Sequence, residues 1–151
     1  MSEWRRARTG EARLLTDLER DANLVALAHV FPPAAHPFPY DGVLERWRSL
    51  LAGDVVVEVV PGEGRLDAFL AHDTTMLRHL AVHPDRWGSG LASSAVARAV
   101  AAGATRLWCL ADNDRARGLY EHLGWRVTGR SRSAEWPPYP IEIEYAAPVD
   151  R

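Results

Sequence analysis

The sequence predicts an α/β fold of the α+β kind: one mixed sheet of six to seven strands, flanked by about four helices. Two observations predict it. Runs rich in β-branched residues are separated by short turns over residues 54–82, which is typical of an antiparallel meander. A strand, a glycine loop, an alanine-rich helix and another strand then follow over residues 75–111. Such a unit normally forms a right-handed parallel crossover.

Local patterns place the first elements. Residues 4–8 are expected to form a short strand. Apolar residues at helical spacing predict a helix over residues 12–30, which the proline-rich segment 31–40 ends. Asp41 is a suitable N-cap for a second helix, and Gly53 ends that helix.

The remaining elements alternate between strands and helices. Asp112 or Asn113 is expected to cap the last helix, and Gly124 to end it. The glycine loop is expected to open a helix over residues 89–102, and residues 131–140 are expected to form a loop. The expected strands cover residues 54–60, 65–71, 75–82, 105–111, 125–130 and 141–147.

Composition limits the class of protein. The chain has 151 residues, 47% of them hydrophobic, which suits one domain over residues 1–151. With 18 basic and 20 acidic residues the net charge is -2, so we expect neither a nucleic-acid nor a membrane partner. The polar N-terminus does not resemble a signal peptide, and a single cysteine, Cys109, allows no internal disulfide, so a cytoplasmic location is expected. No lysine is present, which excludes a Walker A loop and Schiff-base chemistry.

The glycine loop, residues 87–92, is a candidate phosphate site. Its glycines let a ligand approach the main chain, and the first amides of the following helix lack partners. A glycine turn that merely starts a helix is the alternative. A dinucleotide-binding loop would need glycine at Ser93, and a nucleophile elbow would need glycines at Trp87 and Leu91.

A second motif pairs Asn113 with Tyr120, two helical turns apart and therefore on one side of the helix. Taken alone, Asn113 is equally explained as a helix cap and Tyr120 as a core aromatic residue. A phenol beside a thioester can instead protonate or stabilise a departing sulfur.

Both motifs resemble signatures of the GNAT superfamily of N-acetyltransferases. LAVHPDRWGSGLA is similar to the acetyl-CoA signature, a strand followed by Q/R-x-x-G-x-G/A at a helix start; Gly90 and Ala92 match, whereas Trp87 replaces Gln or Arg. NDRARGLYEHLGW is similar to N-x-x-A-x-x-x-Y-x-x-x-G-F, with Trp125 as the last residue. The order of elements resembles the family over residues 4–147.

The resemblance implies transfer of an acetyl group from acetyl-CoA to a primary amine by direct attack. It implies that Tyr120 is the general acid and that a strand backbone amide polarises the acetyl carbonyl. The implied cofactor-binding residues are Leu80, Ala81, Val82, Trp87, Gly88, Ser89, Gly90, Leu91, Ala92 and Asn113. Arg86, Arg115 and Arg117 lie beside these motifs and are candidates for phosphate contacts.

The group that accepts the amine proton does not carry over, because the family's acidic strand position has no match in residues 107–110. His79 and Glu135 are the candidate bases; a water relay or an amine that arrives neutral is equally compatible. His79 and His83 lie roughly 13 Å apart on a strand, too far to share an ion, so no metal is expected.

The segments 31–40 and 131–140 are expected to frame the acceptor, a small-molecule amine or a peptide N-terminus. Phe38, Tyr40, Trp136 and Tyr139 are candidates for an apolar wall, with Glu135 attracting the amine. Loops that merely pack on the sheet are the alternative. A sensor that binds acyl-CoA without turnover, a transferase for longer acyl groups and a homodimer also stay open.

Overall fold

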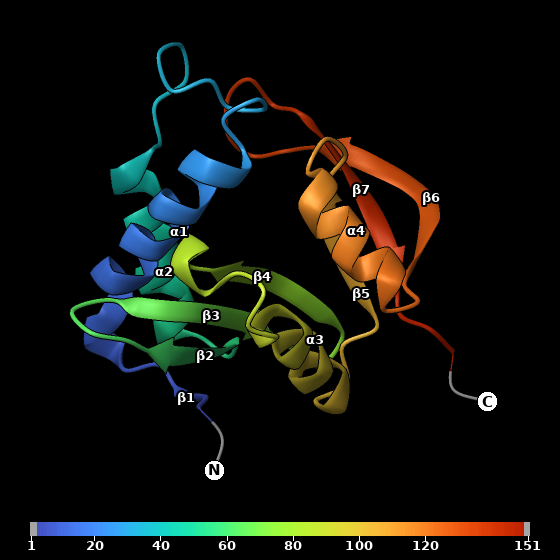
Figure 1. Cartoon of the computed structure of the whole chain (residues 1–151), viewed down its shortest axis with the longest axis horizontal. Coiled ribbons are helices and arrows are strands. Elements are labelled where there is room, and N and C mark those ends of the chain that lie inside the picture. Colours follow the sequence, from blue (N-terminus) through green and yellow to red (C-terminus); the bar gives the residue numbers. More distant parts are fainter. Residues whose placement is uncertain (1–2, 150–151) are drawn as a thin grey trace.

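The computed structural model of the chain describes residues 3–149 and contains one seven-stranded sheet with four α-helices (Figure 1). The strands are β1 (Arg5–Arg6), β2 (Val56–Pro61), β3 (Leu66–His72), β4 (Met76–Val82), β5 (Arg106–Leu110), β6 (Arg126–Ser133) and β7 (Ile141–Ala146). The helices are α1 (Ala12–Ala26), α2 (Tyr40–Ala52), α3 (Leu91–Ala101) and α4 (Asp114–His122), with short 3-10 turns at Thr9–Glu11 and Pro84–Arg86. The predicted mixed sheet and helix number are confirmed.

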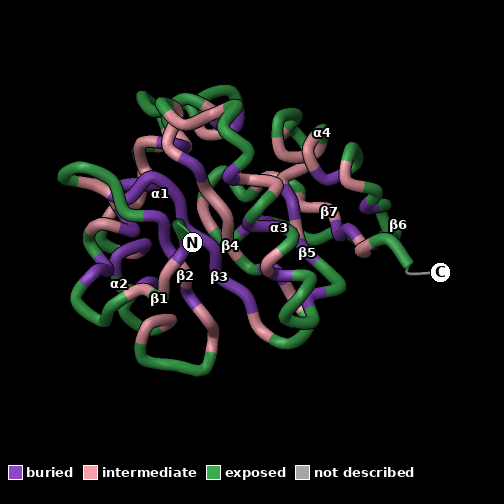
Figure 2. The backbone as a smooth tube through the Cα atoms, turned by 60° about the horizontal axis from the view of Figure 1, so that its bottom comes forward, coloured by how far each residue is buried: buried purple, intermediate pink, exposed green. Residues whose placement is uncertain are grey.

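The sheet has the order β1-β2-β3-β4-β5-β7-β6. Strands β1 to β4 form the predicted antiparallel meander, and β4 and β5 are the parallel pair joined by α3. Helices α1 and α2 cover one face, while α3 and α4 pack on the other. Strand β3 is buried along its whole length because both faces are covered, as Figure 2 shows.

Several predicted boundaries are wrong. Helix α1 ends at Ala26 and not at residue 30, because the backbone leaves the helical conformation at Leu27, where φ is -125°. Residues 27–31 form a separate turn in which the amides of Val30 and Phe31 donate to the Leu27 carbonyl. Asp41 is not the N-cap of α2; Pro39 precedes the first turn and Asp41 lies within it. Strand β6 reaches Ser133, because Gly129, with φ 93°, forms a bulge after which pairing with β7 resumes.

The N-terminal strand is also shorter than predicted. Only Arg5 and Arg6 pair with β2, while the Trp4 side chain turns into the core and its indole Nε1 donates to Ser94 Oγ at 3.1 Å. The large aromatic side chain is therefore used for packing against α3.

Strands β4 and β5 separate soon after they meet. Only Met76 and Leu77 of β4 pair with β5, opposite Arg106 and Leu107. Beyond them β4 continues alone on that side, and Figure 1 shows the β5–β7–β6 part of the sheet turned away from the β2–β3–β4 part. This separation opens the middle of the sheet.

A bulge in β4 sets the direction of His79. The register against β3 passes from His72 opposite Leu77 to Ala71 opposite His79, so Arg78 is the extra residue. The bulge brings the imidazole of His79 against the buried Trp47, with ring centroids 5.4 Å apart. Burial, together with the positive charges of Arg46 and Arg78, lowers the pKa of His79 to about 3. The imidazole is therefore neutral near pH 7.

The lowered pKa of His79 predicts a loss of stability in acid. Between about pH 6.5 and pH 3 the unfolded chain binds a proton at this position that the folded chain does not, so the free energy of unfolding falls as the pH falls through this window. We expect His79→Gln to reduce the slope of unfolding free energy against pH there by up to about 1.4 kcal/mol per pH unit. Urea unfolding at several pH values measures the slope, with His122→Gln on the exposed end of α4 as the matched control; equal slopes in wild type and His79→Gln contradict the assignment.

Candidate active site

The part of β4 that continues beyond its pairing with β5 lines a cavity of about 450 Å³, here called the β4 cavity. Its wall combines the end of α1, strand β4, the glycine loop and one side of α4. Nine of the ten predicted cofactor-binding residues line it, and Tyr120 does so too. The lining residues are Ala22, Asn23, Ala26, Leu27, Leu80, Ala81, Val82, Arg86, Trp87, Gly88, Gly90, Leu91, Ala92, Ser93, Asn113, Arg115, Ala116, Leu119 and Tyr120.

The glycine loop presents free backbone amides at the start of α3. Gly88 and Gly90 have φ of 79° and 85°, a left-handed conformation that glycine adopts without strain. A Cβ on either glycine would meet nothing within 4 Å, so the loop surface is accessible. Among residues 3–149, no acceptor pairs with the amides of Gly88 or of residues 90–93. These donors and the helix dipole together suit an anion such as a diphosphate.

One arginine beside the loop is available for a phosphate. The guanidinium of Arg115 lies 3.8 Å from the ring centroid of Trp87 and has no carboxylate partner in the described part of the chain. Arg86, by contrast, is held by Asp67, with Nη1 to Oδ2 at 2.7 Å. Arg117 donates to the Tyr145 hydroxyl at 2.9 Å. Of the three arginines considered from the sequence, Arg115 is thus the one free to bind an anion.

Trp87 has a structural role at its unusual position. Its Nε1 donates to the carbonyl of Val82 at 2.8 Å, which anchors the loop to the end of β4, and its ring supports Arg115. Trp87 occupies the position where the signature described above has Gln or Arg, and its indole packs against its neighbours there.

Strand β4 turns an unpaired backbone edge toward the β4 cavity. The amide of His83 donates to the carbonyl of Asp67 on the β3 side, at 2.8 Å. Because successive residues of a strand point their N–H and C=O groups to alternate sides, those of Leu80 point to the opposite side, where β5 has already separated. The Leu80 amide can therefore donate to a ligand.

Tyr120 lies at the inner end of this cavity. Its ring is 7% exposed and is held between Trp125 and Tyr145, with centroids 6.3 and 6.0 Å away. Its hydroxyl forms no hydrogen bond with any of residues 3–149. Burial, followed by the nearby Cys109 and Tyr145, raises the pKa of Tyr120, so the phenol stays protonated. It is a hydrogen-bond donor without a protein acceptor.

Asn113 combines two roles. Its Oδ1 accepts from the amide of Ala116 at 3.2 Å and so caps α4, as one interpretation of the sequence holds. The residue also lines the β4 cavity, so its remaining polar atoms face the same space as Tyr120.

Other predicted site residues lie elsewhere. The amide and hydroxyl of Ser89 both donate to the carbonyl of Arg86, and Ser89 does not line the cavity. His79 and Glu135 line neither this cavity nor the one described next; His79 packs on Trp47, and Glu135 is exposed. Their assignment as bases stays a prediction without a contact that supports it. Cys109 is buried, and burial raises the pKa of its thiol to about 12.

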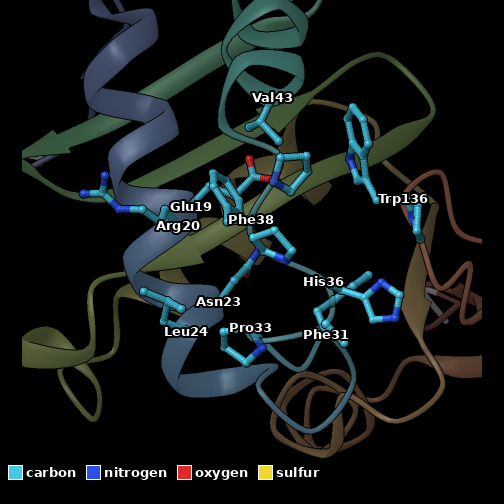
Figure 3. Close-up of a pocket in the computed structure, with 14 residues that line it drawn as sticks. Glu19, Arg20, Asn23, Leu24, Phe31, Pro33, His36, Phe38, Val43 and Trp136 are labelled. Atoms are coloured by element: carbon cyan, nitrogen blue, oxygen red, sulfur yellow. The ribbon is translucent and has the colours of Figure 1, made fainter.

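The two proline-rich segments meet around a second cavity of about 350 Å³, here called the aromatic cavity (Figure 3). Phe38 and Trp136 line it as the sequence suggests. Tyr139 instead points outward and is 57% exposed, and the Tyr40 hydroxyl donates to Asp17 at 2.7 Å. The carboxylate in its wall is Glu19 of α1.

Sequence reasoning missed the contribution of α1 to both cavities. Ala22 and Ala26, one turn apart, present small side chains to the β4 cavity, and Asn23 lines both cavities. The only signal was this pair of alanines with the polar Asn23 beside Ala22. Within residues 3–149, no helix is long and apolar enough to cross a membrane. The same residues contain no group of three or more His, Cys, Asp or Glu side chains placed to hold a metal ion.

Comparison with known proteins agrees with this arrangement. The family model described as "Acetyltransferase (GNAT) family" matches residues 3–125. No curated protein matches the chain. Among solved structures, apo YjaB from Escherichia coli is 22% identical, with a TM-score of 0.74 and 95% of each chain covered.

Two further structures were solved with cofactor. YncA from Salmonella typhimurium with its cofactor acetyl-CoA is 16% identical, with a TM-score of 0.65 and 98% of this chain and 94% of that one covered. PaiA N-acetyltransferase from Thermoplasma acidophilum in complex with coenzyme A is 14% identical, with a TM-score of 0.62 and coverage of 95% and 98%. The likeness to these structures concerns the fold, whereas the family match covers most of the sequence, and on that match the chain belongs to the GNAT family of acetyltransferases.

Proposed function

We propose that the protein transfers the acetyl group of acetyl-CoA to a primary amine, with the cofactor bound in the β4 cavity. The observation that carries this proposal is the hydroxyl of the largely buried Tyr120, a donor without a partner among residues 3–149, in the same cavity as the free amides of the glycine loop. The presence of acetyl-CoA or coenzyme A in two proteins of the same fold supports it.

The cofactor would lie along the cavity from the loop to Tyr120. Its diphosphate would accept hydrogen bonds from the amides of residues 90–93, with Arg115 adding a positive charge. Its pantetheine arm would pair with the unpaired edge of β4, as an added strand does. The thioester would then lie between Leu80 and Tyr120.

The reaction needs two donors at the thioester. The amine nitrogen attacks the carbonyl carbon, negative charge develops on the carbonyl oxygen, and the Leu80 amide is oriented to stabilise it. As the tetrahedral intermediate collapses, the carbon–sulfur bond breaks and the Tyr120 hydroxyl donates to the departing sulfur. Because its pKa is raised, Tyr120 keeps its proton throughout the physiological range and stabilises the thiolate mainly by hydrogen bonding.

Direct transfer fits better than a covalent acyl-enzyme. The only cysteine, Cys109, lies outside the lining of the β4 cavity, and a thiol with a pKa of about 12 supplies almost no thiolate at neutral pH. The amine would lose one proton to water before attack or would arrive neutral. In both cases its nitrogen would lose a further proton to water as the amide forms, and the released thiolate would take one up from water. The cytoplasmic location and a homodimer stay predictions.

The proposal is tested by incubating the protein with acetyl-CoA and a panel of primary amines while free thiol is measured. Thiol release that depends on an amine supports it. Calorimetry with coenzyme A, acetyl-CoA and longer acyl-CoAs is the companion measurement. Tight binding without thiol release for any amine identifies a sensor, and tighter binding of longer chains identifies a different acyl donor.

Tyr120→Phe tests the role of the hydroxyl. We expect kcat to fall roughly 10- to 1,000-fold, because the departing sulfur loses its hydrogen-bond donor, while the KM for acetyl-CoA changes little. The ring packing is kept and no described residue loses a hydrogen bond, so thermal stability should match the wild type. An unchanged kcat would remove Tyr120 from the mechanism.

Arg115→Ala tests the phosphate end of the cavity. Loss of a charge-assisted hydrogen bond should weaken coenzyme A binding roughly 10- to 100-fold, because such bonds contribute about 1.5–3 kcal/mol. Pantetheine, which lacks the diphosphate, should bind both proteins equally. Calorimetry provides both affinities, and Arg126→Ala on the exposed strand β6 is the control. Equal losses for both ligands would show that Arg115 acts on packing and not on phosphate.

A further inference from the structure

The aromatic cavity lies next to the β4 cavity, and Asn23 lines both. Figure 3 shows Glu19, Arg20, Asn23 and Leu24 projecting from α1 on one side of the aromatic cavity, with Trp136 on the other. A ligand there would reach the cofactor cavity past the Asn23 side chain. This places the aromatic cavity where an acceptor would enter.

The wall of this cavity is mainly apolar and stiff. Phe31, Phe38 and Trp136 contribute aromatic rings, and four prolines line the same space. Proline and aromatic side chains lose little conformational freedom when a ligand binds. The cavity volume of about 350 Å³ is at the lower end for small-molecule sites, so it suits a group about the size of one aromatic ring.

One carboxylate faces this apolar space. Oε1 of Glu19 accepts hydrogen bonds from Arg46 and from Nε1 of Trp47, the latter at 3.0 Å. Its Oε2 accepts none from residues 3–149, and the side chain is 15% exposed. Glu19 is thus fixed through one oxygen and has the other available to a ligand.

The remaining polar groups favour a single cation. Asn23 lies one helical turn from Glu19, and its side-chain amide forms no hydrogen bond within the described chain, so both can accept from one ammonium group. The other polar lining residues are Arg20 and His36; Arg20 already pairs with Asp21 at 3.0 Å and would repel a second positive charge.

Gly42 holds Trp136 in place. A Cβ at Gly42 would lie only 2.6 Å from Cη2 of Trp136, so the indole rests directly on the backbone of α2. Glycine inside a helix costs about 1 kcal/mol relative to alanine, and here its lack of a side chain lets the ring close the cavity. The size of the cavity therefore depends on this contact.

We propose that the acceptor is a monoamine with an apolar body about the size of one ring, whose ammonium group is bound by Glu19 and Asn23 while its body packs on Phe38 and Trp136. A free arylalkylamine and a peptide with an N-terminal aromatic residue share this chemistry. Amines with several positive charges are excluded, because Glu19 is the one acidic residue that lines this cavity in the described part of the chain. Acetylation of this acceptor rests on the proposed function; its binding does not.

The test compares matched ligands on the full chain, with binding measured by calorimetry and turnover by thiol release. The ligands are 2-phenylethylamine, its neutral counterpart 2-phenylethanol, ethylamine, spermidine and a tripeptide with N-terminal phenylalanine. We expect 2-phenylethylamine to bind at least 10-fold more tightly than 2-phenylethanol, ethylamine or spermidine. Acetylation of 2-phenylethylamine identifies a free amine as the acceptor, and acetylation of the tripeptide identifies a peptide N-terminus. Preference for spermidine overturns the proposal.

Two variants test the residues. Glu19→Gln keeps the shape of the side chain and should raise the KM for 2-phenylethylamine at least 10-fold, with coenzyme A affinity unchanged; Glu45→Gln, on the exposed side of α2, is the control. Because Glu19→Gln leaves Arg46 without its partner, Gly42→Ala provides a second route. The alanine favours the helix but displaces Trp136. Gly42→Ala should therefore raise the KM for 2-phenylethylamine about fivefold or more and reduce the preference for 2-phenylethylamine over ethylamine.

The outcomes separate this proposal from the proposed function. If coenzyme A binds and thiol is released, yet Glu19→Gln and Gly42→Ala leave the acceptor preference unchanged, the acceptor assignment is wrong and the function stands. If 2-phenylethylamine binds in a Glu19-dependent way but no thiol is released, the function fails and the assignment of the cavity stands.

Discussion

The limited pairing of β4 with β5 is the constraint on which the site depends. Two residue pairs join these strands, enough to keep seven strands in one sheet. Beyond Leu77 the strands separate, and the backbone edge of β4 is left without a protein partner in the middle of the molecule. Unpaired backbone groups in a protein interior are costly unless something pairs with them. An extended ligand with its own amide groups, such as pantetheine, removes that cost when it binds between the strands.

Helix α1 connects the two cavities. Its small residues Ala22 and Ala26 let the β4 cavity extend beneath it, while Glu19, one turn earlier, faces the aromatic cavity. Asn23 stands between them. A rigid helix can hold a cofactor wall and an acceptor group at a constant separation, which is what transfer between two bound molecules requires.

Burial keeps several ionisable groups of the protein neutral. The pKa of Tyr120 is raised, that of Cys109 is raised to about 12, and that of His79 is lowered to about 3, each mainly by loss of solvent. A neutral phenol can donate to a leaving thiolate, and a neutral thiol does not compete as a nucleophile.

The sequence by itself determined the parts that depend on local chemistry. The glycine loop before α3, the cap at Asn113 and the position of Tyr120 two turns later follow from backbone freedom and helical spacing, and nine of the ten predicted cofactor residues share one cavity. Only the tertiary structure decided which carboxylate lines the aromatic cavity. The sequence predicted Glu135, whereas the packing of α1 against the proline-rich segments places Glu19 there. The bulge at Arg78 and the separation of β4 from β5 also arise from pairing between distant strands, which no local pattern encodes.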